Sequence, residues 1–356
     1  MGSRERLLRA IMGEEPDRVP VGIHSISTYL PYLKRILRRD IDDYQALKMF
    51  GFDPTFYRSF TKGENRSDWR VKEEVITAAS DYKIVRVTIN TPKGGLSQLE
   101  KRTPITSWTL EPLLKKAEDV DCLAYRPLSR PDVKAYEREF DRLGKEGIIR
   151  SFAGGQGDAV SLRGTEQLCL DFYERPSWVL ELFELLTQRS LEYIEGLPSH
   201  CIDLVEIAGH IGAFIPPRLF EKFVLPYDSR VVEALHKKGL YTTYHDCGKV
   251  MHLLELIASM GTDCIETLTP PSHGGDVNLG EVKRRVGERL CLIGGFDQAL
   301  LERGSQEDVK EGVKKCIGEA AQGGGYILYT TDHFFEAPME NLYTMVETAR
   351  RYGRYL

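Results

Sequence analysis

A histidine and a cysteine stand two residues apart in His245-Asp246-Cys247, at the end of the β-rich run GLYTTYH (239–245). In an extended backbone, residues i and i+2 point to the same side, so an imidazole and a thiolate could face one cation. Zinc accepts this combination of nitrogen and sulfur ligands. The alternative is a free cysteine beside a helix N-cap, and the pair alone leaves both interpretations open.

A carboxylate inside an apolar strand favours the metal interpretation. Glu206 lies within CIDLVEIA (201–208), where an unpaired buried carboxylate would be costly. It therefore needs a cation, a hydrogen-bonding partner or a solvated cavity. Asp332 and His333 add donors after the last β-rich run. We therefore predict a zinc site whose ligands are drawn from His245, Cys247, Asp332 and Glu206, with Glu206, His245 and Asp332 as the catalytic residues.

The elements that must position these residues follow a regular rhythm from about residue 105. Short β-rich runs alternate with longer amphipathic helices, which implies parallel strands joined by helical crossovers. The runs span residues 147–153, 201–208, 239–245, 263–268, 289–295 and 324–330. The number of units and the absence of a GxGxxG turn favour a closed barrel over an open sheet. We therefore predict an α/β fold, a single (β/α)₈ TIM barrel over residues 1–356.

The first hundred residues begin this barrel and decorate it. Residues 1–19 have the pattern of an amphipathic N-terminal helix, and RVPVGI (18–23) has that of the first strand. GFDPTF (51–56) opens a second extended stretch. Residues from about 70 to 104 contain alternating runs and the turn-like NTPKGG, which predict an antiparallel β-hairpin excursion.

In such a barrel, the active site lies at the carboxyl ends of the strands. Polar and metal-competent groups recur after the predicted strands and are sparse before them. Asp53, after the second strand, is one such group, and Gln156 belongs to the glycine-rich GGQGD (154–158). We assign substrate binding to His24, Tyr29, Gln156, His210, Glu266 and His333.

Composition limits the partners. Hydrophobic residues make up 42% and charged residues 28% of the chain, as in soluble globular proteins. The net charge of −5 gives no reason to expect nucleic acid, and no run of apolar residues is long enough for a membrane span. The seven cysteines are scattered and odd in number, which fits a reducing compartment. We therefore expect a cytoplasmic protein.

Five segments, in order along the chain, resemble the uroporphyrinogen decarboxylase superfamily. They are RERLLRAIMGEEPDRVPV (4–21), HDCGKV (245–250), IGGFD (293–297), GGGYIL (323–328) and APMEN (337–341). The resemblance spans essentially the whole chain. It implies a (β/α)₈ barrel with a cavity at the carboxyl ends of the strands.

The superfamily contains two chemistries, and the decarboxylases match this chain less well. They use no cofactor and hold substrate carboxylates with arginines in an RQAGR segment after the first strand. Here that stretch is HSISTYLPYL (24–33), without arginine, and the later GHG segment is replaced by TTDHFFE (330–336). A decarboxylase of a tetrapyrrole or another cyclic acid is therefore the alternative function.

The second branch consists of corrinoid-dependent methyltransferases, which bind zinc through His-x-Cys and a later cysteine. His245 and Cys247 match the first two positions, and the third falls near Asp332. The resemblance implies a methyltransferase, for example an O-demethylase. It would move a methyl group between a small O-, N- or S-methyl substrate or thiol and a corrinoid. The corrinoid would be carried by a partner protein, because the chain has no DxHxxG motif. A non-catalytic corrinoid- or tetrapyrrole-binding barrel is a third possibility, and a homodimer is left open.

Overall fold

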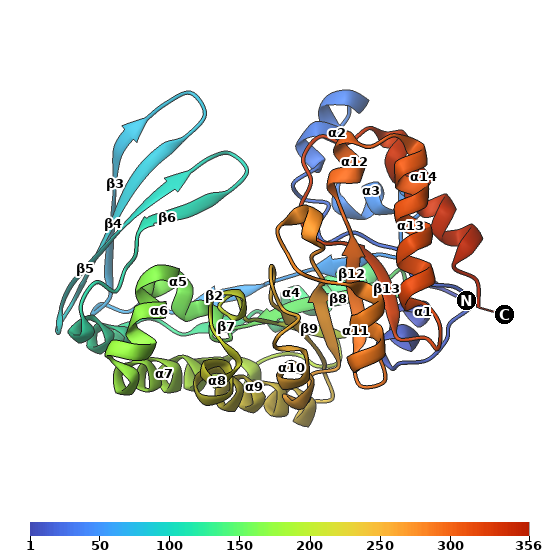
Figure 1. Cartoon of the computed structure of the whole chain (residues 1–356). Coiled ribbons are helices and arrows are strands. Elements are labelled where there is room, and N and C mark those ends of the chain that lie inside the picture. Colours follow the sequence, from blue (N-terminus) through green and yellow to red (C-terminus); the bar gives the residue numbers. More distant parts are fainter. Residues whose placement is uncertain (356) are drawn as a thin grey trace.

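The central feature of the computed structural model, which describes residues 1–355, is a curled sheet of seven parallel strands (Figure 1). In sheet order the strands are β1 (Thr55–Tyr57), β8 (Ile148–Ala153), β9 (Leu204–Ala208), β10 (Tyr241–His245), β11 (Cys264–Thr267), β12 (Cys291–Phe296) and β13 (Tyr326–Thr330). Every residue of β9, β11 and β13 is buried. Such continuous burial is typical of parallel strands covered on both faces.

Residues 20–22 fill the place of an eighth strand between the two edges of this sheet. Val21 pairs with Leu328 of β13 in parallel, and the Gly22 amide donates to the Leu328 carbonyl at 3.0 Å. On the other side, the Asp53 amide donates to the Val21 carbonyl at 2.7 Å. A side chain at Gly22 would collide with the ring of Tyr329, so this close approach requires glycine. The predicted (β/α)₈ barrel is thereby confirmed.

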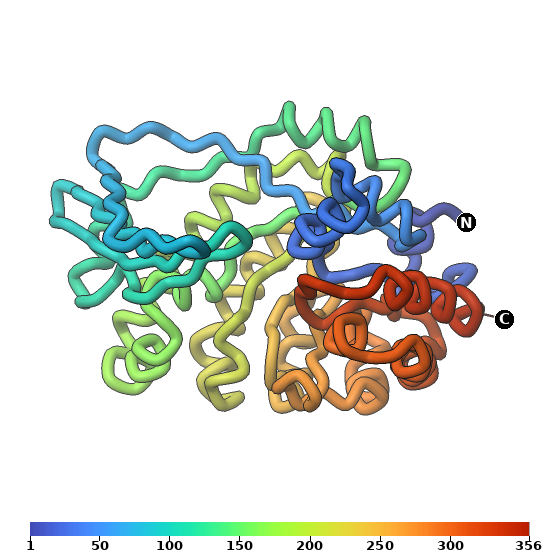
Figure 2. The backbone as a smooth tube through the Cα atoms, turned by 90° about the horizontal axis from the view of Figure 1, so that it is seen from above, coloured from blue at the N-terminus to red at the C-terminus, as the bar shows by residue number. Residues whose placement is uncertain are grey.

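Helices pack around the sheet as crossovers between its strands (Figure 2). They are α4 (Val133–Leu143), α5 (Gly157–Arg163), α6 (Thr165–Glu174), α7 (Pro176–Glu195), α8 (Pro217–Leu219), α9 (Leu225–Lys237), α10 (Leu254–Ser259), α11 (Leu279–Val286), α12 (Ala299–Arg303), α13 (Gln306–Ala320) and α14 (Met339–Tyr352). Helices α2 (Leu30–Leu37) and α3 (Asp43–Phe50) lie in the chain between residues 20–22 and β1. Short 3₁₀ or π turns lie at Ala117–Tyr125 (η1), Gly212–Phe214 (η2), Phe220–Val224 (η3) and Pro271–His273 (η4).

The N-terminal helix α1 (Ser3–Ile11) packs against residues from the amino-terminal half of the barrel. Its buried Leu7, Ala10 and Ile11 join one apolar cluster with strand residues such as Ile148 and Leu204. Asp53 lies at this same end, because it precedes β1. It accepts hydrogen bonds from Arg6, Arg18 and Ser3. Asp53 is therefore a structural anchor rather than the active-site group that its predicted place after a strand suggested.

The excursion is a four-stranded antiparallel sheet that stands away from the barrel, on the side opposite the two termini (Figures 1 and 2). Its strands are β3 (Arg70–Ala78), β4 (Lys83–Thr91), β5 (Gly94–Arg102) and β6 (Ser107–Glu111). A further pair, β2 (Thr61–Gly63) with β7 (Ser129–Pro131), connects this region to the barrel. The excursion is larger than a hairpin, and all of β3 is exposed. No helix within residues 1–355 is long and apolar enough to cross a bilayer.

Candidate active site

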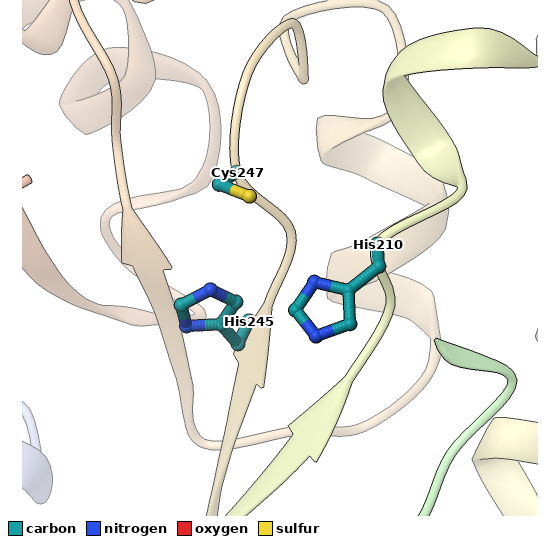
Figure 3. Close-up of side chains that lie close together, drawn as sticks. All are labelled: His210, His245 and Cys247. Atoms are coloured by element: carbon teal, nitrogen blue, oxygen red, sulfur yellow. The ribbon is translucent and has the colours of Figure 1, made fainter. Parts of the chain in front are cut away.

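Two histidines and one cysteine converge at the carboxyl ends of β9 and β10 (Figure 3). His245 is the last residue of β10, Cys247 follows it by two positions, and His210 lies just after β9. One potential ligand atom from each of these residues lies within 4.8 Å of the other two. We call His210, His245 and Cys247 the ligand triad. Two nitrogen donors and one sulfur donor at this spacing could hold one metal ion.

The backbone after β9 brings His210 to this place. The Gly209 amide donates to the His245 carbonyl at 2.8 Å, which ties the loop to the end of β10. A Cβ atom at Gly209 would lie 2.8 Å from the hydroxyl of Tyr244, so a larger residue does not fit there. His210 itself has a φ of 56°, in the left-handed region that non-glycine residues rarely adopt. Such strain is retained where the surrounding structure fixes it, often at functional sites.

The triad shifts the protonation of its own members. Hydrogen bonds with His210 and then His245 lower the pKa of the Cys247 thiol to about 6. Burial disfavours charge on His245, but its hydrogen bonds with Cys247 and Glu266 outweigh burial and raise its pKa well above the usual value. Cys247 is exposed and His245 is buried. The thiolate therefore forms readily and remains accessible from the barrel mouth.

A second cluster lies directly beneath His245, and we call it the ion-pair network. It consists of Tyr57, Arg150, Glu206 and Glu266, from four strands. Arg150 is 1% exposed and donates to Glu266 Oε2 at 2.6 Å and to Glu206 Oε2 at 2.7 Å. A further Arg150 contact reaches Glu266 Oε1. The Tyr57 hydroxyl donates to Glu206 at 2.6 Å, and its ring centroid lies 4.3 Å from the Arg150 guanidinium carbon.

The network connects to the triad through Glu266. The strand register places His245 beside Glu266, and His245 Nδ1 lies 2.7 Å from Glu266 Oε1. The distance from Nδ1 to Glu206 is longer, 3.6 Å. Burial opposes ionisation of both glutamates, but the charge of Arg150 holds their pKa values below the usual range. The negative charges of the two glutamates are thus balanced by the positive charge of Arg150 and by a proton or a metal ion on His245.

Two further histidines, His24 and His333, lie beside the triad on the side of β13. The His24 ring centroid lies 5.4 Å from that of His245 and 4.9 Å from that of His333. His24, His245 and Glu266 form a second group with ligand atoms within 4.8 Å of one another. Burial lowers the pKa of His24 to about 4, and burial also lowers the pKa of His333. Both rings are therefore neutral near pH 7 and can accept a hydrogen bond, but they are weaker bases than an ordinary histidine.

Other predicted site residues lie elsewhere. Asp332 belongs to neither group of ligand atoms; its side chain is 51% exposed and lies 3.8 Å from His273. Tyr29 is fully buried and donates to the Ala337 carbonyl at 2.9 Å. Gln156 is also buried, and its side chain donates to Thr187 at 3.2 Å. Tyr29 and Gln156 are therefore held in the core by other residues, and the Asp332 side chain is exposed.

The structure also assigns groups that the sequence interpretation missed or placed in another role. His210, expected as a substrate contact, completes the ligand triad, while Glu206, expected as a ligand, pairs with Arg150. Arg150 and Tyr57 were not singled out. The arginine inside the apolar run GIIRSFA could have indicated this ion pair. A buried guanidinium needs carboxylate partners, just as Glu206 needs a cation.

The fold and the site together define the class of this protein. It is a (β/α)₈ barrel with a cluster of two histidines and a cysteine at the carboxyl ends of its strands. The family model described as uroporphyrinogen decarboxylase (URO-D) matches residues 143–352, which include the ligand triad, Arg150 and both glutamates. The chain therefore belongs to the uroporphyrinogen decarboxylase family, whose members here include enzymes of two named activities.

Some relatives are named as decarboxylases and others as methyltransferases. The chain is 22% identical to uroporphyrinogen decarboxylase of Coxiella burnetii (strain Dugway 5J108-111) over 377 residues, covering 98% of this chain and 95% of that protein. It is 26% identical to methylcobamide:CoM methyltransferase MtbA of Methanosarcina acetivorans over 252 residues, covering 67% of this chain and 70% of that protein. A solved methyltransferase from Methanosarcina mazei aligns over 99% of both chains with a TM-score of 0.68. Because that alignment has 16% identity, it supports the fold alone.

Proposed function

We propose that this protein is a zinc-dependent methyltransferase that moves a methyl group between a small heteroatom substrate and a corrinoid carried by a partner protein. The observation that carries the proposal is the convergence of His210, His245 and Cys247 at the barrel mouth. The methyltransferase name of the Methanosarcina acetivorans relative supports the same chemistry.

The donor set of the triad fits zinc. Catalytic zinc sites use three protein ligands from His, Cys, Asp and Glu and leave a position for substrate. Ligating histidines usually hydrogen-bond a carboxylate through their second nitrogen, and Glu266 stands 2.7 Å from His245 Nδ1. A zinc ion held there would polarise a thiol or a methylated heteroatom and make it a better nucleophile or leaving group.

The protein's own residues would orient the substrate and handle its proton. The Glu266 carboxylate fixes the ring of His245, leaving Nε2 free to face the cation or substrate. His24 and His333 are neutral imidazoles beside this ring, and either can accept a hydrogen bond from a thiol, whose proton passes to solvent when its sulfur takes the methyl group. In the reverse direction, solvent returns a proton to the departing oxygen, nitrogen or sulfur.

The overall transfer balances without an added oxidant or reductant. A thiol and a methyl-cobalt(III) corrinoid would give a methyl thioether, a cobalt(I) corrinoid and one proton. The carbon–cobalt bond breaks with its electron pair on cobalt, and sulfur forms the new bond to carbon. Demethylation of an ether, amine or thioether is the reverse, with the heteroatom keeping the electron pair of the broken bond.

A decarboxylase of a cyclic acid is the second candidate. The observation that favours it is the match to the Coxiella burnetii uroporphyrinogen decarboxylase over 98% of this chain. The segment after residues 20–22 holds Ser25, Ser27 and Thr28, which offer no charge to substrate carboxylates. Release of carbon dioxide from uroporphyrinogen by metal-free protein would establish this function in place of methyl transfer.

Metal content and anaerobic turnover test the main proposal together. We expect about one zinc per chain in the wild-type protein, and zinc-dependent loss of the methyl group from methylcobalamin in the presence of a small thiol. Each of H210A, H245A and C247A should lose both properties. C169S is the matched control, because Cys169 is a cysteine of α6 outside the triad. Wild-type protein with far less than one metal ion per chain, or full turnover by H210A, would sink the proposal.

A further inference from the structure

Two arginines share a cavity beside the ligand triad. The cavity has a volume of about 310 Å³ and lies between residues after β1, the segment before β7, the end of β8 and helix α7. Arg126 follows η1, and Arg189 belongs to α7. The guanidinium of Arg126 makes no hydrogen bond or ion pair with any of residues 1–355, and that of Arg189 donates to the Pro127 carbonyl at 2.6 Å. We call this cavity the arginine pocket.

Like charges in a confined space favour a bound anion. Burial and then the nearby charge of Arg126 lower the pKa of Arg189, which shows that the two cations repel each other. A guanidinium presents a planar fork of donors that matches the oxygens of a carboxylate, sulfonate or phosphate. An oxyanion between the two side chains would remove the repulsion and satisfy donors that have no protein partner.

The rest of the lining is also suited to an oxyanion. The buried hydroxyl of Tyr193 lies at the pocket within hydrogen-bonding reach of the hydroxyls of Tyr136, Ser151 and Ser59. Ser59, Thr61 and Ser129 add further hydroxyl donors. The acidic group of the pocket, Asp158, is close enough to Arg126 and Arg189 for their charges to act on its carboxyl, so it competes with a bound anion for the two guanidinium groups.

The turn after β8 joins the arginine pocket to the triad. Gly154 lines the pocket, and Gly157 packs on His210 so closely that a Cβ atom there would lie 2.7 Å from His210 Cδ2. The two glycines are three residues apart in the short segment between β8 and α5, and Asp158 of the pocket is close enough to His210 for the imidazole charge to act on its carboxyl. A small molecule could therefore place one end in the pocket and the other at the triad.

We propose that the arginine pocket binds the oxyanion end of the methyl-transfer substrate, so that this substrate is a small thiol or methylated compound with a carboxylate, sulfonate or phosphate group. The anion site stands on the geometry of Arg126 and Arg189. Its assignment to the reacting molecule rests on the proposed function. No arginine of the segment after residues 20–22 is needed, because the charge comes from η1 and α7 instead.

Direct binding of inorganic sulfate tests the site without any turnover. Calorimetric titration should show R126Q binding sulfate at least about tenfold more weakly than wild type, as expected for loss of one charge-assisted contact. Because the Arg126 side chain makes no hydrogen bond within residues 1–355, R126Q should unfold at the wild-type temperature. R130Q is the matched control, since Arg130 is exposed and paired with Glu64. D158N, which removes the negative charge, should bind sulfate more tightly. Equal sulfate affinity in wild type, R126Q and D158N would overturn the proposal.

A matched pair of thiols tests whether the anion belongs to the substrate. Methyl transfer from methylcobalamin should favour 3-mercaptopropionate over 3-mercaptopropan-1-ol, and the ratio of their kcat/KM values should fall at least about tenfold in R126Q. An unchanged ratio, with sulfate binding intact, would assign the pocket to an anion other than the substrate and overturn this part. If neither thiol reacts while sulfate binding still depends on Arg126, the proposed function fails and the anion site stands.

Discussion

The ligand triad and the ion-pair network lie one above the other in the same barrel, yet they treat charge in opposite ways. In the network, Arg150 satisfies Glu206 and Glu266, and every one of these side chains is buried. In the triad, Cys247 is exposed and its sulfur faces two imidazoles. The network thus pairs both of its carboxylates within the protein, with Arg150 Nε left without a partner in residues 1–355, whereas the triad has ligand atoms to offer. Charged side chains that pair with one another indicate a structural cluster. Metal-ligand atoms without a partner at a barrel mouth indicate a candidate catalytic site.

A third buried acid shows what Arg150 contributes. Asp228 is as inaccessible as Glu266, but its neighbours are the neutral Tyr244 hydroxyl and the Gln156 amide. Burial raises the pKa of Asp228 to about 7, while Arg150 holds that of Glu266 below its usual range. The presence of one buried cation therefore decides whether a buried carboxyl keeps or loses its proton.

Removal of Arg150 should produce the largest effect. R150M leaves two buried glutamates without their cation, and we expect the free energy of unfolding to fall by about 3–5 kcal/mol. Urea denaturation at pH 7 measures this loss. R130M, at an exposed arginine, should change stability by less than about 0.5 kcal/mol. The triple variant R150M/E206Q/E266Q should recover part of the loss, and a triple variant no more stable than R150M would contradict the charge argument.

Removal of the hydrogen bond that links the two clusters should have a smaller effect, which metal binding would reveal. E266Q removes the carboxylate that orients His245, and zinc affinity should fall about ten- to a hundredfold. Chelator competition measures the affinity. E206Q is the matched control, because Glu206 lies 3.6 Å from His245 Nδ1 and should matter less. If E206Q weakens zinc binding as much as E266Q, net charge rather than orientation couples the clusters.

The smallest expected effect is a change in pH dependence at Asp228. Its pKa is about 7 in the folded chain and near 3.8 when unfolded, so the folded state holds the extra proton between these values. Stability from this group is therefore present at low pH and is lost as pH rises through about 7. Between pH 5 and 6, wild type should lose about 1.3 kcal/mol relative to D228N, whose amide mimics the protonated acid. Parallel denaturation curves for the two proteins would show that Asp228 is ionised throughout.

Much of the barrel could be predicted from the sequence because its signals are local. Five of the six runs from 147–153 to 324–330 contain the observed strands, and β12 extends one residue beyond the remaining run, since continuous apolar stretches between amphipathic helices have few other solutions. The weakest predictions concern short elements. Residues 20–22 are fixed by hydrogen bonds to β13 and to Asp53, and Asp53 itself lies before β1, which begins only at Thr55.

The sequence by itself determined that His245 and Cys247 lie together at a strand end, because their spacing of two residues acts within a single segment. It also showed that Glu206 needs a partner, because a carboxylate in an apolar strand is costly wherever it lies. Only the tertiary structure decided that the partner is Arg150 and that His210 completes the triad. Both choices depend on which strand ends meet across the barrel, and the turn at Gly209 that aims His210 has no signature in the composition around it.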